Sequence, residues 1–292
     1  MIDYNPKDWF TFIFRIHQAD TVRKLLPMII AISVYSGLVA WLESAVWKLP
    51  EDSRVKNISM MHSLLGFVIS LLLAFRSNSA YDRWWEGRKL WGSLVNNSRN
   101  LALRMNALLP EEDRESRQLF RAVIPNYAFA LKNHLRGQFL PQEFVTPEGV
   151  ELPPLDPARH VPNQLASILM KRVYGLQKQG VLTGEQLLSV NAELQSFTDI
   201  CGACERILNT PIPFSYSVFL KKFIFFYVMT LPFGLAFNLG YWVILAVAFV
   251  FFVLASMELI AEEIENPFGS DANDLPTERI STNIRRHVEE IL

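Results

Sequence analysis

The stretch AFRSNSAYDRWWEGRKLWG, residues 74–92, follows directly on the apolar run ISMMHSLLGFVISLLL, residues 58–73. Its interleaved basic and aromatic residues leave three interpretations: a nucleic-acid surface, a pocket lining, or the end of a membrane helix. The chain carries a net charge of −1 over 292 residues, so no basic field attracts nucleic acid. Asp82 and Glu86 also break up the basic residues. We therefore expect no nucleic-acid partner, and favour the helix end, where aromatics and arginines gather.

Apolar and charged residues are segregated along the chain. Apolar residues concentrate at 25–47, 58–75 and 223–257, and charged residues at 76–222 and 258–292. About 20 apolar residues suffice for one helix to cross a bilayer, and the third apolar region is too long for one crossing. Asn238 and Gly240 are the turn residues that divide it. The sequence predicts an all-α membrane protein with transmembrane helices at about 25–47, 58–75, 215–237 and 241–262.

The remaining segments form one charged side of the predicted topology. By the positive-inside tendency, this side is the cytoplasm. It holds a cytosolic helical region at about 76–214, a C-terminal tail at 263–292, and both termini. Within the region, helices are expected at 163–178 and 184–208, and a loop rich in prolines at 138–162. All 292 residues are then expected to form a single domain.

Enzyme chemistry finds no support in the sequence. The phosphate-binding, dinucleotide-binding, zinc-protease and serine-hydrolase motifs are missing, and the histidines are scattered. Cys201 and Cys204 have the spacing of a redox pair or half a zinc site, but two small residues one helical turn apart are the favoured interpretation. The acids Glu258, Glu262, Glu263 and Glu265 are interpreted as a solvated helix end rather than an acid–base or metal site. We expect no enzyme and no required cofactor.

The second apolar segment has two distinct faces when placed on a helix. One stripe, at i, i+4, i+8 and i+12, is apolar: Met60, Leu64, Val68 and Leu72. The adjacent face is small or polar: Ser59, His62, Ser63, Gly66 and Ser70. Either the small face packs on a neighbouring helix and the stripe faces lipid or a central axis, or the small face lines water. A ring of apolar side chains around an axis would be a hydrophobic constriction.

The segment EEIENPFGSDANDLP, residues 262–276, crowds oxygen-bearing side chains around a glycine. Calcium takes such ligands, whereas an Asx-rich turn after a helix explains the same composition. Both interpretations stay open at this point.

Three blocks in this order resemble the bacterial bestrophin-like proteins: FRSNSAYDRWWEGRKLWG, CERILNTPIPFSY and ENPFGSDANDLP. The resemblance covers nearly the whole chain. It implies a homopentamer around one central pore, so that each subunit contacts identical copies, with the second helix lining a membrane neck and the cytosolic region enclosing a vestibule with a second aperture. Animal members of that family are calcium-activated chloride channels.

The resemblance also implies roles for particular residues. Anchoring on Arg76 and Tyr81 places the neck at Met60, Leu64 and Val68, and anchoring on Gly66 places it instead at Ser59, Ser63 and Phe67. We prefer the first register because it gives a hydrophobic ring. The residues expected at the membrane boundary and in helix packing are Arg76, Tyr81, Arg83, Trp84 and Trp85. Those expected at the cytosolic aperture are Val181, Leu182, Glu185 and Gln186.

The calcium clasp of the animal members corresponds to Asn266, Asp271 and Asp274. Ser270, Ala272 and Asn273 stand where a run of acids would be expected, so the segment is either a reduced calcium site or a structural link between subunits. Calcium regulation is therefore not a firm expectation.

The sequence thus predicts a pentameric channel that passively conducts monovalent anions, chloride first, across the bacterial inner membrane. Its partners are the permeating ions, the bilayer and four further copies of the chain. Two alternatives remain: a cation-selective channel on the same scaffold, favoured if Glu185 faces the axis, and a non-conducting structural or sensory membrane protein.

Overall fold

The computed structural model describes residues 21–47, 58–147 and 149–292, and these are helical with no strand among them. They form two compact units. The apolar unit comprises the described residues up to Arg83, together with 211–266 and 271–273. The bundle unit comprises residues from Trp84 to Thr210, 267–270 and 274–292. The all-α class predicted from the sequence is confirmed.

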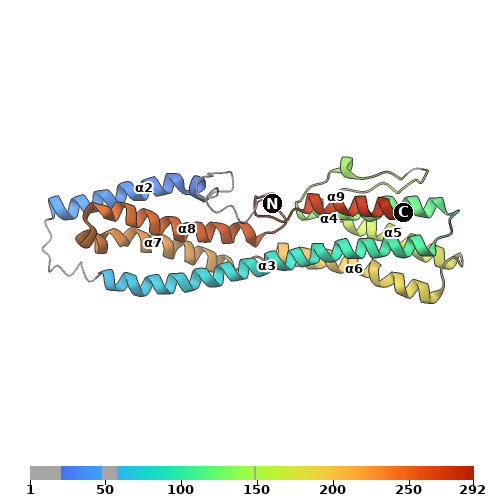
Figure 1. The fold of residues 1–292 in the computed structure, drawn as a ribbon, viewed down its shortest axis with the longest axis horizontal. Coiled ribbons are helices and arrows are strands. Elements are labelled where there is room, and N and C mark those ends of the chain that lie inside the picture. Colours follow the sequence, from blue (N-terminus) through green and yellow to red (C-terminus); the bar gives the residue numbers. More distant parts are fainter. Residues whose placement is uncertain (1–20, 48–57, 148) are drawn as a thin grey trace. The chain divides into compact units, whose positions relative to one another are not determined.

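The apolar unit is built from long apolar helices. They are α2 (Thr21–Trp41), which continues as a π-helical turn η1 (Leu42–Val46), the first part of α3, α7 (Phe214–Leu239) and α8 (Val243–Glu265). Helices α2, α7 and α8 lie side by side (Figure 1). Their shared core is aliphatic and aromatic, and includes Ile69, Leu73, Leu220, Ile224, Val228, Val247 and Phe251. Three stretches are long and apolar enough to cross a membrane: Thr21–Val46, Ile58–Leu108 and Phe214–Glu265.

The third stretch holds two helices, as the sequence predicted. Helix α7 ends at Leu239 and α8 begins at Val243, with the short 3-10 turn η4 (Gly240–Trp242) between them. Gly240 has φ +54°, a conformation that costs other residues more than glycine. Of the two turn residues chosen from the sequence, Gly240 closes the hairpin, whereas Asn238 lies in the last turn of α7.

Helix α3 differs from the prediction. It runs without interruption over Ile58–Leu108, 51 residues, rather than ending near residue 75. No proline lies within it, and the arginines and tryptophans of residues 74–92 are compatible with a helix. The sequence therefore marks a change of surroundings near Arg76 and not a change of secondary structure.

The bundle unit contains α4 (Arg114–Leu135), η3 (Pro141–Glu143), α5 (Val161–Lys178), α6 (Gly184–Asn209) and α9 (Thr277–Ile291). The expected helices at 163–178 and 184–208 are confirmed. Helix α6 starts with a capping box between Thr183 and Gln186, which satisfies donors at the helix start. The core gathers large side chains from the second part of α3, from α4 and from α6, including Trp91, Met105, Phe120, Tyr127 and Phe197.

Helix α9 lies in the segment expected to be only a tail. Its buried positions are Thr277, Ser281, Ile284 and Val288, at i, i+4, i+7 and i+11, the spacing of one helical face. That face packs on α4.

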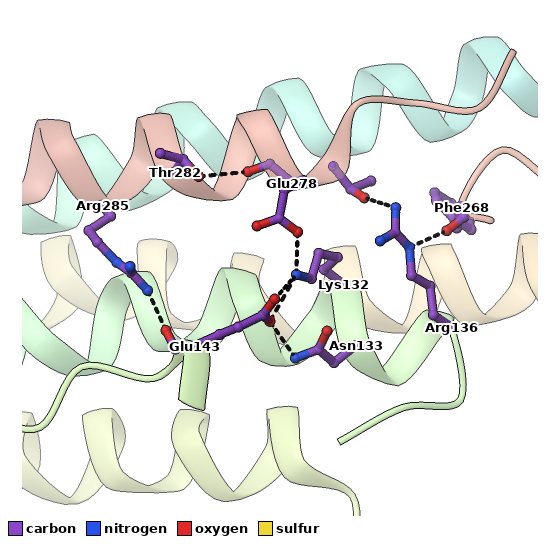
Figure 2. A network of polar contacts seen from close by, with 9 residues as sticks. Lys132, Asn133, Arg136, Glu143, Phe268, Glu278, Thr282 and Arg285 are labelled. Atoms are coloured by element: carbon purple, nitrogen blue, oxygen red, sulfur yellow. Dashed lines mark hydrogen bonds and ion pairs between the residues drawn. The ribbon is translucent and has the colours of Figure 1, made fainter. Parts of the chain in front are cut away.

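A buried lysine holds α9 to α4 (Figure 2). Lys132 is 2% exposed, and its Nζ donates to both carboxylate oxygens of Glu143, at 2.7 and 2.8 Å, and to Glu278 of α9. Asn133 also donates to Glu143 at 2.9 Å. Arg285 of α9 donates to the Glu143 carbonyl. A buried ammonium needs such partners, so η3, α4 and α9 are fixed together by one charge.

This network predicts an acid-sensitive contribution of Glu143 to stability. Burial by itself raises the pKa of the Glu143 carboxyl, but hydrogen bonds from Lys132 and Asn133 outweigh it and the pKa is lowered. Because its pKa is lowered in the folded state, Glu143 stabilises the fold at pH values above the ordinary glutamate pKa of about 4.3. This stabilisation is lost as the pH falls through the pKa of the folded state. The wild type should therefore lie well above Glu143→Gln in thermal stability at pH 7, with the gap closing toward pH 3.

The control for this measurement is Glu290→Gln. Glu290 is 66% exposed, in an ion pair with Arg286 at 4.0 Å, and its substitution should change the melting temperature in detergent little at either pH. A gap between wild type and Glu143→Gln that does not depend on pH would contradict the assignment.

Candidate pore helix and the buried ion pairs beside it

One face of α3 packs inside the apolar unit. His62, Ile69, Leu73 and Arg76 are buried, and His62 Nε2 lies 3.0 Å from the Thr230 hydroxyl of α7. The backbones approach closely: a Cβ on Gly66 would lie 2.9 Å from the Tyr227 hydroxyl, and one on Gly234 would lie 3.1 Å from the Ser59 nitrogen. Part of the small-residue face thus packs on α7 of the same chain.

The opposite face of α3 is apolar and exposed within the subunit. Met60, Leu64 and Val68, the predicted neck residues, are 76%, 68% and 43% exposed, and Phe67 of the second register is 72% exposed. Ser63 is also exposed, whereas Ser59 is half-buried. Both registers therefore keep side chains on the free side of the helix.

A buried guanidinium anchors α3 against α8. Arg76 is 1% exposed. Its Nη2 donates to Glu265 Oε2 at 2.7 Å, and its Nε lies 3.5 Å from Glu258 Oε2. Arg is the cation best suited to such a site because its planar fork binds carboxylates directionally. Arg76 therefore contributes to helix packing through ion pairs with Glu258 and Glu265.

Glu265 also organises the backbone around it. Its Oε1 accepts from the Ile212 N–H at 2.7 Å, and its carbonyl accepts from Arg83 Nε at 3.0 Å. The Tyr216 hydroxyl donates to the Leu72 carbonyl at 2.9 Å. The start of α7, the end of α8 and the middle of α3 are therefore joined by polar contacts around one carboxylate.

The acidic cluster of α8 is not the solvated helix end that the sequence suggested. Glu258 is 4% exposed and Glu263 is 9% exposed. Glu263 accepts from Lys24 of α2, and from Asn273 at 2.6 Å. Only Glu262, paired with Lys221 at 2.9 Å, matches the prediction, with its side chain 52% exposed. The spacing of these acids along the sequence does not show that their side chains contact different partners in the fold.

The aromatic signature residues divide between the two units. Tyr81 of the apolar unit is 52% exposed. In the bundle unit, Trp84 packs partly buried against the core, and Trp85 is 40% exposed. The guanidinium of Arg88 lies 5.1 Å from the Trp85 ring centroid and 5.9 Å from that of Trp84, within cation–π range.

Comparison with known proteins gives the family. Residues 1–290 match the profile described as Bacterial/Fungal Bestrophin protein. This chain belongs to the bacterial/fungal bestrophin family. A bestrophin relative from Nostoc, named a voltage-dependent anion channel-forming protein, is 35% identical over 98% of this chain and 92% of its own length. The protein YneE of Escherichia coli K12, named in the same way, is 33% identical over 76% of this chain and 73% of its own.

Solved structures show the same fold. The crystal structure of a bacterial bestrophin homologue from Klebsiella pneumoniae matches with a TM-score of 0.78 at 24% identity, over 91% of this chain and 98% of that one. With its apolar helices, this bestrophin is a membrane protein, and the expected resemblance is confirmed.

Of the expected aperture residues of this bestrophin, Val181 and Leu182 lie between α5 and α6, and Glu185 and Gln186 lie in the first turn of α6. Leu182 is 2% exposed and belongs to the core of the bundle unit. Gln186 is held in the capping box by Thr183, whose N–H donates to Gln186 Oε1 at 2.8 Å. Glu185 is exposed, and Val181 is partly buried. The aperture role of Val181, Leu182, Glu185 and Gln186 remains a prediction.

The residues matched to the calcium clasp lie in the turn segment that follows α8. Asp274 is 2% exposed, and its Oδ2 lies 2.7 Å from where a Cβ of Gly269 would be. The turn around it is closed by the Leu275 N–H donating to the Pro267 carbonyl at 2.9 Å. Asn266 and Asp271 belong to the apolar unit and Asp274 to the bundle unit. The calcium role of the three residues stays a prediction from the resemblance.

The two cysteines are free thiols on α6. Both are buried, and burial raises the pKa of Cys201 to about 12 and that of Cys204 further. A protonated, buried thiol is a poor nucleophile, which speaks against a redox pair. Cys201 nevertheless has a neighbour that the sequence did not reveal, because His160 Nε2 lies 4.0 Å from its Sγ.

Removing the buried guanidinium should strongly destabilise the apolar unit. Arg76→Ala leaves Glu258 and Glu265 without their cation, and breaking a buried pair in this way costs about 3–5 kcal/mol. Unfolding in detergent, followed by tryptophan fluorescence, measures the loss. Lys221→Ala is the matched control. It removes the exposed cation that pairs with Glu262 of α8, and this loss should cost less than about 1 kcal/mol. Equal effects of the two substitutions would contradict the buried-pair assignment.

Proposed function

We propose that this protein is an ion channel that passively conducts monovalent anions, chloride first. The proposal rests on membership of the bacterial/fungal bestrophin family and on the names of relatives, which are called voltage-dependent anion channel-forming proteins. The structural observation that supports it is the apolar face of α3, where the side chains of Met60, Leu64 and Phe67 are largely exposed on the described part of the subunit. A helix with one packed face and one free apolar face suits a ring of subunits around an axis.

The proposed assembly is a homopentamer in the bacterial inner membrane. Four spans per subunit are formed by α2 with η1, the first part of α3, α7 and α8. The bundle unit and both termini lie in the cytoplasm, following the excess of basic residues on that side. Each neck ring consists of five Met60, five Leu64 or five Val68 side chains, and such a ring resists wetting. Val181, Glu185 and Gln186 are the proposed lining of the cytosolic aperture.

The neck register can be tested by thiol accessibility. Met60→Cys, Leu64→Cys and Val68→Cys should react with a charged, water-soluble thiol reagent in proteoliposomes, and Ser59→Cys and Ser63→Cys should react far more slowly. The wild type is the baseline, because its cysteines are buried and protonated at neutral pH. The reverse pattern would move the neck to Ser59, Ser63 and Phe67.

Conduction itself is tested by chloride efflux from proteoliposomes. The triple substitution of Met60, Leu64 and Val68 by alanine widens and softens the constriction, so its efflux should exceed that of the wild type several-fold. If neither protein releases chloride, and neither passes sodium or potassium, the channel function is wrong and the non-conducting structural or sensory alternative stands.

Ion selectivity decides between the two channel hypotheses. One observation favours a cation channel: Glu185 is exposed, and the pKa of its carboxyl is lowered by backbone and Thr183 hydrogen bonds, so a ring of five would be negatively charged. In bilayers with a sodium chloride gradient, the reversal potential should move toward the chloride equilibrium potential. A shift toward the sodium potential that Glu185→Gln abolishes would establish the cation channel instead.

A further inference from the structure

A cluster of metal-binding side chains lies in the bundle unit, away from the proposed pore residues. It comprises His134 at the end of α4, His160 at the start of α5, and Glu205 of α6, whose donor atoms all lie within 4.8 Å of one another. His134 Nε2 and His160 Nε2 approach the same Glu205 oxygen, at 2.6 and 2.7 Å. Cys201 is one helical turn before Glu205, with its Sγ 4.0 Å from His160 Nε2.

We propose that His134, His160, Glu205 and Cys201 form a binding site for a divalent transition-metal ion of the zinc class. The donor set is the first argument. Two imidazole nitrogens, one carboxylate oxygen and one cysteine thiolate are the ligand types that zinc and its neighbours take in proteins, usually four at a time. A bound ion would displace the proton of the Cys201 thiol to water. They come from three separate helices, so a bound ion would cross-link α4, α5 and α6.

The distances between donors are the second argument. Ligand atoms about 2.0–2.3 Å from a tetrahedral zinc ion are roughly 3.3–3.8 Å from one another. The two contacts to Glu205 are shorter than this range, and the contact between Cys201 and His160 is slightly longer. Shifts of about 1 Å or less at these three contacts would bring them into the tetrahedral range.

The surroundings suit an exchangeable ion. The side chains of His134, His160 and Glu205 are 31%, 28% and 31% exposed, so water can deliver a metal. A hollow of about 250 Å³ lined by His134, Gly137 and Phe139 adjoins them.

The tautomer of His160 gives the site a distinctive consequence. Its Nδ1 accepts the backbone N–H of Asn163 at 3.1 Å and caps α5. A neutral imidazole that accepts at Nδ1 carries its proton on Nε2 and donates it to Glu205. A metal on Nε2 moves that proton to Nδ1, and the cap is then lost. Metal binding and capping of α5 by His160 therefore exclude one another.

Cobalt titration of the purified full-length protein tests the site. Co²⁺ bound by the four donors should give visible absorption bands and a near-ultraviolet thiolate charge-transfer band. His134→Ala and Glu205→Gln should weaken binding at least about 10-fold. Cys201→Ser should remove the ultraviolet band and leave the visible bands. His287→Ala is the control: His287 lies 3.2 Å from Arg99 Nη2 in the same unit, and its loss should leave binding unchanged.

Two results would overturn the proposal. One is cobalt binding that is no tighter in the wild type than in Glu205→Gln, with circular dichroism showing both folded; the group would then be only a hydrogen-bonded triad. The other concerns His160 alone. Hydrogen exchange of the peptide around Asn163 should speed up when metal is added, and unchanged exchange in metal-loaded protein would remove His160 from the ligand set. Neither result bears on the channel function, which is measured by ion flux.

Discussion

The charge of Arg76 is the constraint on which the apolar unit depends. A guanidinium that is 1% exposed among apolar helices is costly to bury unless carboxylates meet it. Glu258 and Glu265 supply them, and Glu265 in turn binds the Ile212 N–H and, through its carbonyl, Arg83. The pairing fixes more than a contact. Because a helix turns by about 100° per residue, directing Arg76 inward also directs Ile69 and His62 inward, and so determines which side chains α3 leaves free.

The free face of α3 is thus a result of the packed one. The same rotation that buries His62 against Thr230 leaves Met60, Leu64 and Phe67 exposed. Close approach at Gly66 and Gly234 restricts rotation of α3, because a Cβ on Gly66 would press on Tyr227 of α7 and a Cβ on Gly234 of α7 would press on the Ser59 backbone of α3. Any function of the exposed face, in lipid or around an axis, therefore depends on small residues and ion pairs on the opposite side.

Local patterns in the sequence were enough to predict the apolar helices, the Gly240 hairpin and the helices at 163–178 and 184–208. Continuity of α3 was missed because a change in polarity resembles a helix end when no structural breaker is present. Helix α9 was missed because its apolar face amounts to positions such as Ile284 and Val288 in a charged segment. The burial of Glu258, and the meeting of His134 with Glu205, 71 residues away, depend on tertiary packing, which spacing along the chain does not encode.

The hairpin between α7 and α8 bears on how the protein enters its membrane. The two helices are separated by the residues of η4, Gly240–Trp242, and a connection of this length spans roughly 10 Å when extended. As the ribosome delivers the chain, α7 cannot settle in lipid far from where α8 must follow. The short connection therefore keeps α7 and α8 as neighbours in any environment. The helix that carries Glu258 and Glu265 is in this way held beside α7, within reach of Arg76 on α3.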